Sequence, residues 1–314
     1  MKRVLVTGAT GFVGRPLVSA LAQAGHAVRA AVRAADAAPF PAGTHVAANV
    51  DLTRPVDWRP LLEGVDAVVH LAGIAHTGAA IPDSVYDRVN RAATAGLAEA
   101  AARAGIRHLI FVSSVRAQTG AAAPHIVTED DAPAPSDAYG RSKLAAEATV
   151  AASGVPFTIL RPALIFGPGV KGNLRALLRL AALPMPLPFG AFDNRRSLVS
   201  LADFIGAVRL TLENPPTRAA CLVAHPQALS LAEIVAALRR GRGRRPGLLS
   251  VPPVLFRRAL EAAGKHDLWE RLGGELVVDP SRLVAAGWKP SVPMPESLAE
   301  FAAQATAPRK ADTT

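Results

Sequence analysis

Short apolar runs alternate along the chain with segments in which apolar residues recur every three or four positions. Short continuous apolar runs are typical of strands buried on both faces of a parallel sheet. They predict strands at residues 4–6, 27–32, 46–50, 66–70, 109–113, 157–160 and 221–224. After the first run, Val13, Leu17, Leu21 and Ala24 share one face of a predicted helix. Further helices are predicted at residues 84–104, 137–153, 173–182, 231–239 and 296–303.

Strands that alternate with helices indicate an α/β fold, here a Rossmann-type doubly wound parallel sheet. The amino-acid composition changes after the sixth predicted strand, where glycine and proline become frequent. We expect residues 1–165 to form the sheet domain, with segments near 197–226 returning to it. Residues 166–304 are expected to form mainly a smaller C-terminal substrate-binding domain at the carboxyl edge of the sheet, where ligands bind. Residues 305–314 are expected to be a disordered tail.

Composition limits the class of protein. Half of the 314 residues are hydrophobic, so the chain can build a large core. No apolar run approaches the ~18 residues that a membrane helix needs, and we therefore expect no membrane partner. The single cysteine, Cys221, excludes an internal disulfide and suits a reducing compartment, which predicts a cytoplasmic protein.

The net charge of +10 raises the question of an anionic partner. The basic residues are dispersed except at residues 239–245, where the sequence reads RRGRGRR. No nucleic-acid-binding motif accompanies this cluster, so we expect no nucleic-acid partner. We interpret the cluster as a solvated loop, with anion binding as the alternative.

Three glycines follow the first predicted strand and precede the first predicted helix. Gly8, Gly11 and Gly14 have the spacing G-x-x-G-x-x-G. Glycines permit a tight turn and close approach of the backbone to a pyrophosphate, and the helix N-terminus adds N–H groups and positive potential. Strand, glycine turn and helix together predict that residues 1–165 bind a dinucleotide. The alternative is a connection that binds nothing.

The end of the second predicted strand indicates which dinucleotide is preferred. An acidic residue there would bind the ribose 2′-hydroxyl of NAD(H), but the position carries Arg33. Because arginine suits a 2′-phosphate, NADP(H) is favoured, with NAD(H) as the alternative. Asp36 could still supply the acid, and Arg33 could be a plain surface residue.

Three further residues form a candidate catalytic group. Ser114 ends the fifth predicted strand, and Tyr139 and Lys143 lie one turn apart on the following helix. A phenol serves as an acid or base for a carbonyl–alcohol pair when its pKa falls towards neutrality, and a lysine ammonium nearby favours that fall. The serine hydroxyl can hydrogen-bond the same substrate oxygen. A nicotinamide would supply the hydride chemistry.

These motifs resemble those of the extended short-chain dehydrogenase/reductase family, in its NAD-dependent epimerase/dehydratase branch. The resemblance covers about residues 1–300. It rests on residues 7–14, 51–52, 71–73, 113–114, 161–162 and 167–169, on Asn90, and on the Tyr139-x-x-x-Lys143 pair.

The resemblance implies that Ser114, Tyr139 and Lys143 form the active site, with Asn90 supporting a proton relay through the lysine. The cofactor contacts that follow are Gly8, Thr10, Gly11, Phe12, Val13, Gly14, Arg33, Asp51, Leu52, Leu71, Ala72, Gly73, Asn90, Tyr139, Lys143 and Pro162. The substrate contacts are Ser114 and Arg116, Asn173 and Arg196 at a diphosphate, and Leu187 and Phe189 beside a uracil. No metal is expected.

More narrowly, residues 113–116, 186–190, 195–201 and 271–279 resemble bacterial enzymes of surface-polysaccharide sugar synthesis. With the expected NADP(H) site, this favours a reductase of a UDP-4-keto-6-deoxy-N-acetylhexosamine in which Tyr139 donates the proton. One alternative is a UDP-sugar 4-epimerase, acting on a UDP-N-acetylhexosamine or UDP-glucose with tightly bound NAD. Another is a non-catalytic dinucleotide-sensing regulator. By analogy with relatives, helices 84–104 and 137–153 could form a homodimer contact.

Overall fold

The computed structural model describes residues 1–34, 39–48, 50–75, 81–215, 218–262, 264, 269 and 273–305. Three parts of the sequence predictions lie outside these described residues. They are Asp36, residues 271–272 of the segment 271–279 that resembles sugar-synthesis enzymes, and the expected tail beyond residue 305. Within the described residues, no helix is long and apolar enough to cross a bilayer.

A seven-stranded parallel sheet forms the centre of the molecule, in the order β10-β6-β5-β4-β1-β2-β3. Its strands are β1 (Arg3–Thr7), β2 (Ala27–Ala31), β3 (His45–Ala47), β4 (Ala67–His70), β5 (His108–Val112), β6 (Phe157–Pro162) and β10 (Ala219–Val223). The predicted Rossmann-type doubly wound sheet is thus confirmed. The third strand is shorter than predicted and ends at Ala47, because it is an edge strand with β2 as its neighbour.

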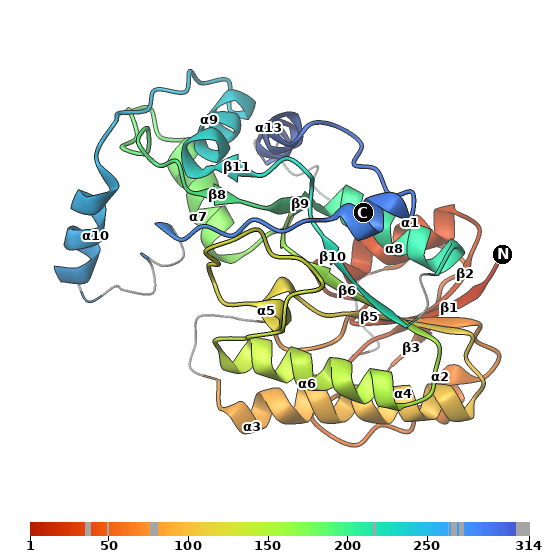
Figure 1. Ribbon diagram of the computed structural model, residues 1–314. Coiled ribbons are helices and arrows are strands. Elements are labelled where there is room, and N and C mark those ends of the chain that lie inside the picture. Colours follow the sequence, from red (N-terminus) through yellow and green to blue (C-terminus); the bar gives the residue numbers. More distant parts are fainter. Residues whose placement is uncertain are drawn as a thin grey trace.

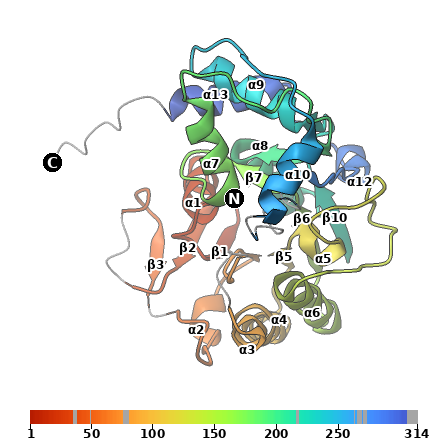
Figure 2. The same ribbon diagram turned by 90° about the vertical axis from the view of Figure 1, so that its left-hand side faces the viewer.

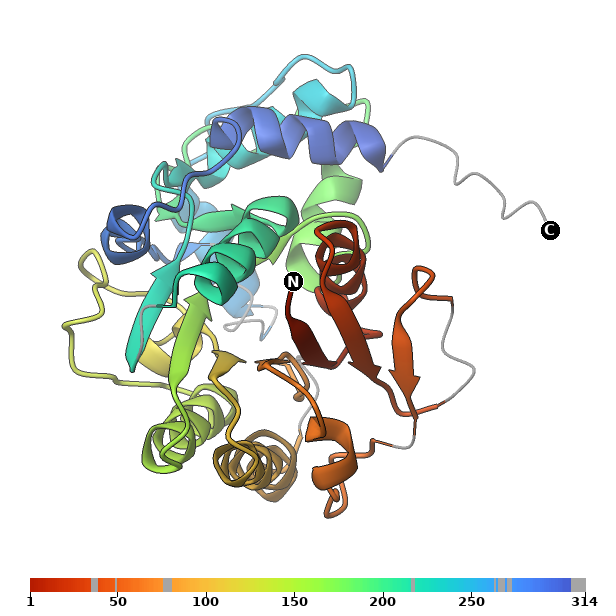
Figure 3. The same ribbon diagram turned by 90° about the vertical axis from the view of Figure 1, so that its right-hand side faces the viewer.

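Helices cover both faces of this sheet, as Figures 1 and 3 show. They are α1 (Gly14–Gln23), α2 (Arg59–Leu62), α3 (Asp83–Tyr86), η1 (Asp87–Ala92), α4 (Ala93–Arg103), α5 (Val115–Gln118), α6 (Ala138–Ala152) and α8 (Leu201–Glu213). Figure 1 places α3, α4 and α6 below the sheet, and α1 and α8 above it. The predicted helix 84–104 contains a π-helical stretch, η1.

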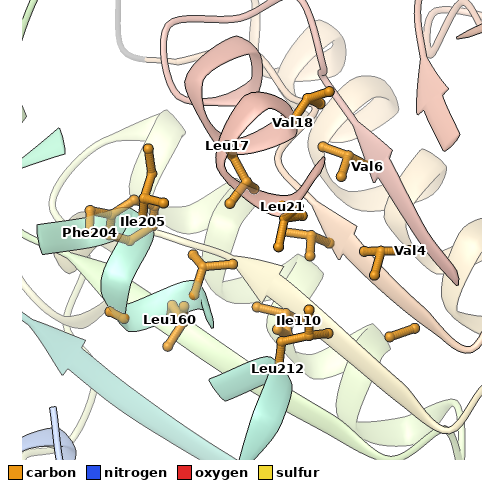
Figure 4. Close-up of a cluster of buried hydrophobic side chains, with 14 of the residues drawn as sticks. Val4, Val6, Leu17, Val18, Leu21, Ile110, Leu160, Phe204, Ile205 and Leu212 are labelled. Carbon is orange, nitrogen blue, oxygen red and sulfur yellow. The ribbon is translucent and has the colours of Figure 1, made fainter. Parts of the chain in front are cut away.

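The core lies on both faces of the sheet because alternate residues of each strand point to opposite sides. Val4 and Val6 of β1 face α1 and α8, where they join a cluster with Leu17 and Phe204 (Figure 4). Leu5, between them, belongs to the cluster beneath α4 and α6. All of these side chains are fully buried, so β1 is anchored from both sides and holds the glycine turn at its end.

A smaller unit covers the carboxyl ends of the strands. Its helices are α7 (Gly172–Ala181), α9 (Leu231–Gly241), α10 (Pro253–Ala262) and α13 (Met294–Gln304), whereas α12 (Ser281–Ala285) packs against β10 of the central sheet. Parallel strands β7 (Leu164–Phe166) and β9 (Leu198–Ser200) pair with each other, and β8 (Arg195–Arg196) pairs antiparallel with β11 (Leu229–Ser230). Figure 2 looks onto this side of the molecule, with α7 and α10 in front.

The arginine-rich segment differs from the predicted solvated loop. Arg239 and Arg240 belong to α9, and Arg239 is buried, with 4% of its surface exposed. Its guanidinium donates to the carbonyl oxygens of Arg245, Leu183 and Met185 at 3.0, 3.2 and 3.3 Å. Arg239 therefore ties the end of α9 to the proline-rich segment after α7.

Candidate active site

The glycine turn between β1 and α1 leaves no room for side chains. Gly8 has a φ of +67°, and a Cβ there would lie 2.8 Å from the backbone nitrogen of Ala72. A Cβ on Gly14 would lie 2.1 Å from the carbonyl oxygen of Gly8. Glycine is therefore required at both positions, and the first turn of α1 is held against the end of β1.

The N-terminus of α1 is open to an anion. Its N-cap residue, Val13, makes no side-chain hydrogen bond to the helix, and the first turn carries no acidic residue. Backbone N–H groups there can bind a phosphate, and the helix dipole adds positive potential. Thr10, Gly11 and Phe12 lie between the two required glycines, with Thr10 and Gly11 exposed. A dinucleotide pyrophosphate fits this turn, which would hold it through backbone groups.

A chain of buried polar groups connects this turn to the helix that carries Asn90. The Ala72 N–H donates to Thr7 Oγ1 (3.2 Å), which lies 2.6 Å from His70 Nδ1. His70 Nε2 lies 2.9 Å from Thr94 Oγ1, and Thr94 donates to the Asn90 carbonyl oxygen at 2.6 Å. Because Thr94 uses its hydrogen on Asn90, His70 donates through Nε2 and accepts at Nδ1. Burial lowers the pKa of His70 to about 3, so the ring is neutral.

A cavity of about 430 Å³ lies beyond the ends of β2 and β3, where the adenosine part of a dinucleotide is expected. Arg33, Asp51, Arg54 and Asp57 line it. Hydrogen bonds from Thr53 lower the pKa of Asp51. Two guanidinium groups therefore share the cavity with carboxylates. Arg54 was not predicted, because the local sequence pattern does not show where its side chain points.

Ser114 and Tyr139 lie together at the end of β5. Ser114 is the N-cap of α5 and accepts from the Arg116 N–H at 3.1 Å. Tyr139 lies in the first turn of α6 and shares a side-chain hydrogen bond with Ser114. The Tyr139 ring is tilted against that of Tyr86, with ring centroids 6.2 Å apart. The two hydroxyls thus form one hydrogen-bonding pair.

Lys143 lies one turn further along α6 and is buried, with 5% of its surface exposed. Its Nζ donates to the Val112 carbonyl oxygen at 2.7 Å and lies 4.2 Å from the centroid of the Phe111 ring. The other face of Phe111 is occupied by His70, with ring centroids 5.6 Å apart in a stacked arrangement. The lysine is therefore held at the carboxyl end of β5, beside Tyr139 on the same helix.

The ionisation of this pair differs from the expectation that Lys143 lowers the pKa of Tyr139. Burial raises the pKa of Tyr139 to about 12, and this effect exceeds the opposing one of the hydrogen bond with Ser114. Burial also lowers the pKa of Lys143 to about 7, although the charge of Glu147 opposes this. Desolvation disfavours both charged forms, and it dominates here because Lys143 is buried and Tyr139 is half-buried.

Asn90 lies in the π-helical stretch η1 and is buried, with 1% of its surface exposed. Its side chain accepts from the Ile74 N–H (2.8 Å) and donates to the Ile74 carbonyl oxygen (3.0 Å) and to Ser142 Oγ (3.0 Å). A Cβ on Gly73 would lie 2.8 Å from Asn90 Oδ1. Asn90 therefore fixes the loop after β4 against α6. Its partner on that helix, Ser142, immediately precedes Lys143 in the sequence.

Next to the candidate catalytic group lies a buried ion pair that sequence reasoning missed. Arg161 donates to Glu147 through Nε at 3.0 Å and through a terminal nitrogen at 2.5 Å. Ser113 Oγ also donates to Glu147, and Gln118 accepts from Arg161. Glu147 lies four residues after Lys143, on the same face of α6. This spacing is the one signal in the sequence that could have drawn attention to it.

Two arginines lie near the site, Arg116 in α5 and Arg196 in the smaller unit. Arg116 donates to Asp137 at 2.5 Å, and the charges of Asp137 and Arg116 act on Tyr139 in opposite directions. Arg196 lies in β8, where burial and the nearby charge of Arg116 lower its pKa to about 10. The guanidinium groups of Arg116 and Arg196 are thus close enough for their charges to interact. Asn173 is exposed at the second position of α7.

The remaining predicted contacts are mostly buried. Leu187 and Phe189 are 4% and 6% exposed and pack in an apolar cluster with Phe192. Their place beside a uracil stays a prediction. Leu52 is buried in the core below the sheet, Pro162 ends β6, and Leu71 is half-buried after β4. Among the described residues, no cluster of metal-binding side chains is present.

The fold and these motifs agree with the comparisons to known proteins. The model of the NAD dependent epimerase/dehydratase family matches residues 4–221. The chain therefore belongs to this family, and it is an enzyme of the extended short-chain dehydrogenase/reductase type.

Three relatives span nearly the whole chain. UDP-glucose 4-epimerase of Vibrio cholerae is 34% identical over 317 residues, which cover 96% of this chain and 94% of the relative. dTDP-6-deoxy-L-talose 4-dehydrogenase (NAD(P)(+)) of Kitasatospora kifunensis is 29% identical over 322 residues, covering 98% and 96%. The structure of MoeE5 in complex with UDP-glucuronic acid and NAD is 25% identical, covers 96% of this chain and 99% of that one, and superposes with a TM-score of 0.75.

Proposed function

We propose that the protein is an NADPH-dependent reductase that converts a UDP-4-keto-6-deoxy-N-acetylhexosamine to its 4-hydroxy sugar. The observation that carries the proposal is the pair Arg33 and Arg54 in one cavity at the adenosine end. Two guanidinium groups suit a 2′-phosphate, which distinguishes NADP(H) from NAD(H). A reductase releases its oxidised cofactor after each turnover, whereas an epimerase retains it through both half-reactions.

In this reaction Tyr139 would donate a proton to the substrate oxygen, which becomes the C4 hydroxyl. Ser114 would hydrogen-bond the same oxygen, since its hydroxyl already pairs with that of Tyr139. Lys143 would bind the nicotinamide ribose, and Asn90 would hold the loop beside it. Arg196, with Arg116 and Asn173, would bind the substrate diphosphate. The nicotinamide supplies the hydride.

The reductase is distinguished from the epimerase by the need for added reductant. The assay gives the purified chain a UDP-4-keto-6-deoxy-N-acetylhexosamine and NADPH, and follows NADPH absorbance. We expect stoichiometric oxidation of NADPH. Interconversion of two UDP-hexosamines without added cofactor, together with retained NAD⁺, would replace the reductase by the epimerase.

The role of Tyr139 can be tested with a matched control, because the chain has two tyrosines. Tyr139→Phe removes the hydroxyl that would transfer the proton, and should lower kcat by about 10²–10⁴-fold. Tyr86→Phe removes the hydroxyl of the neighbouring ring and should leave kcat within about threefold, a change worth less than ~1 kcal/mol. Equal activity of the two variants would contradict the proton-donor role.

Cofactor preference tests Arg33 separately from the sugar chemistry. A charge-assisted hydrogen bond contributes roughly 1.5–3 kcal/mol, so NADPH should bind at least about tenfold more tightly than NADH. Arg33→Asp should reverse the order, because a carboxylate repels the phosphate and accepts from a ribose hydroxyl. Calorimetric titration with both cofactors measures this. A wild-type preference for NADH would refute the assignment.

The runner-up is a UDP-sugar 4-epimerase, and specific observations favour it. The Vibrio cholerae relative carries that name, and the structurally similar MoeE5 binds NAD. The carboxylates of Asp51 and Asp57 in the adenosine cavity would suit a ribose hydroxyl. Against this, the Kitasatospora relative is a 4-dehydrogenase of a 6-deoxy sugar nucleotide that uses NAD(P)(+), which is the reductase chemistry in reverse.

A further inference from the structure

Two stretches of the chain contain no aspartate or glutamate: residues 161–192, which lead from β6 into the smaller unit, and residues 234–260. They lie side by side, because Leu187 pairs with Leu248 and the Leu249 N–H donates to the Leu187 carbonyl oxygen at 2.9 Å. The bonds from Arg239 to residues 183 and 185 join them a second time. The surface that these adjoining segments form contains basic and apolar side chains but no acidic ones.

The apolar side chains of this surface are unusually exposed for their size. Leu183, Met185, Leu249, Val254 and Leu255 are 38%, 58%, 53%, 49% and 52% exposed. Large aliphatic side chains are ordinarily buried, and a group of them on adjoining segments marks an interaction site. We call these five residues the apolar ridge.

The ridge is fixed to the body of the protein by aromatic packing. In the sequence of α10, Phe256 follows Val254 and Leu255 and precedes two arginines. Its ring stacks on that of Phe189, with ring centroids 5.8 Å apart. It also packs edge-on against Phe192, at 5.3 Å. The inward side of α10 is thereby covered, and Val254 and Leu255 project from its outward side.

Basic side chains flank the ridge. Arg245 and Arg258 are exposed beside it, whereas Arg257 is paired with Glu261 at 2.7 Å. A cavity of about 630 Å³ opens between α7, the end of α9 and α13. Its polar rim is formed by Lys171, Arg175, Arg179, Arg242 and Gln304, and its floor includes buried Leu178 and Phe301.

We propose that this surface binds the face of a bilayer that contains anionic phospholipid. Phosphate headgroups would meet the arginines, each of which adds to the attraction of a basic segment for an anionic surface. The apolar ridge would enter the boundary between headgroups and acyl chains, as the apolar face of an interfacial helix does. The protein would thus lie on the membrane without spanning it, contrary to the expectation from the sequence that it has no membrane partner.

A nucleic acid carries the same phosphate charge but fits the surface less well. Proteins that bind single strands present aromatic side chains for stacking. The ridge is aliphatic throughout, and Phe189 and Phe256 are turned into the body of the protein. Aliphatic side chains gain from entry into lipid and gain little from a phosphodiester backbone, so the bilayer is favoured.

The orientation has a consequence for the active site. Figure 2 looks onto α7 and α10, and the same side holds the carboxyl ends of the sheet strands. The membrane-bound protein would therefore turn its catalytic edge towards the bilayer. The membrane proposal does not depend on the proposed reductase activity, since binding can be measured without substrate.

The test is co-sedimentation of the full chain with vesicles of phosphatidylcholine alone and with vesicles that also contain phosphatidylglycerol. We expect binding to the mixed vesicles, weakened by salt. Arg245→Gln and Arg258→Gln should each lower the affinity about fivefold, the equivalent of ~1 kcal/mol per arginine. Arg107→Gln, an exposed arginine outside this surface, should change it less than about twofold.

A second pair of variants tests the lipid rather than the charge. Leu255→Ser should weaken binding several-fold because it removes buried apolar area. Ile126→Ser is its control, since Ile126 is 59% exposed outside the ridge. If the arginine variants bound the mixed vesicles as tightly as Arg107→Gln, the proposal that this surface binds the bilayer would be overturned. Loss of binding in the arginine variants, with no loss in Leu255→Ser, would indicate attraction to any polyanion and would overturn the bilayer assignment.

Discussion

The substitution Glu147→Gln should lower the free energy of unfolding strongly, because it removes one charge of the buried ion pair between Glu147 and Arg161. Glu147→Gln keeps the shape of the side chain and one acceptor oxygen, but removes the negative charge. The two side chains are only 5% and 7% exposed. Arg161 would therefore keep its charge in the interior without a counter-ion, with an amide group facing its donors.

The size of the effect follows from this burial. Removing one partner of a buried pair costs roughly 3–5 kcal/mol, because the remaining charge has lost its solvation and its partner. Because glutamine retains one acceptor oxygen, we expect the lower end of this range, a loss of about 3 kcal/mol in the free energy of unfolding. The control is Glu261→Gln, which breaks the Arg257–Glu261 pair one turn apart on α10. Those side chains are 58% and 33% exposed, and such a pair contributes only ~0.3–0.5 kcal/mol.

The assay is urea unfolding of the wild type and both variants, followed by circular dichroism. A second measurement separates charge from packing. Glu147 raises the pKa of Lys143, so its removal should shift the pKa of the lysine below about 7. A pH titration of cofactor binding should move to lower pH in Glu147→Gln and stay unchanged in Glu261→Gln. Equal unfolding free energies for the two variants would refute the reasoning.

Three further changes have defined outcomes. The pKa of Lys143 is lowered from 10.5 to about 7 in the folded chain. Between these pH values the unfolded chain holds one more proton than the folded chain, so the free energy of unfolding rises with pH. Lys143→Met should flatten this rise when the free energy of unfolding is measured from pH 7 to 10. Gly14→Ala should abolish cofactor binding and destabilise the fold, because its Cβ would lie 2.1 Å from the Gly8 oxygen; Gly96→Ala, with its nearest neighbour at 3.6 Å, should be neutral or stabilising in the same unfolding experiment. His70→Phe leaves the Thr7 hydroxyl hydrogen without its acceptor and should cost roughly 1–3 kcal/mol on unfolding; an unchanged midpoint would contradict the buried hydrogen-bond chain.

Local spacing accounts for what could be predicted. Gly8 and Gly14 are part of a short motif whose geometry is determined within about one helical turn, and Tyr139 and Lys143 share a helix face for the same reason. The inner strands of the central sheet were predicted because they are buried on both faces and read as short apolar runs. Information of this kind lies within a few neighbouring residues.

The parts that escaped prediction depend on distant segments. Glu147 and Arg161 belong to a helix and the following strand, and no local pattern shows that the two side chains pair. The pKa values of Tyr139 and Lys143 are set by how far packing removes them from water, which spacing does not show. Strands of two or three residues, such as β8 and β9, are too short to carry a periodic pattern.

The position of β10 at the edge of the sheet has a consequence for biosynthesis. β10 pairs with β6 through Ala219 and Thr158, so the sheet is completed by residues that leave the ribosome after β6 and α7. Until then β6 is an unpaired edge, and such edges promote association between chains. A nascent chain halted before residue 219 should be prone to aggregate, and a fragment that ends near residue 165 should need a chaperone to remain in solution.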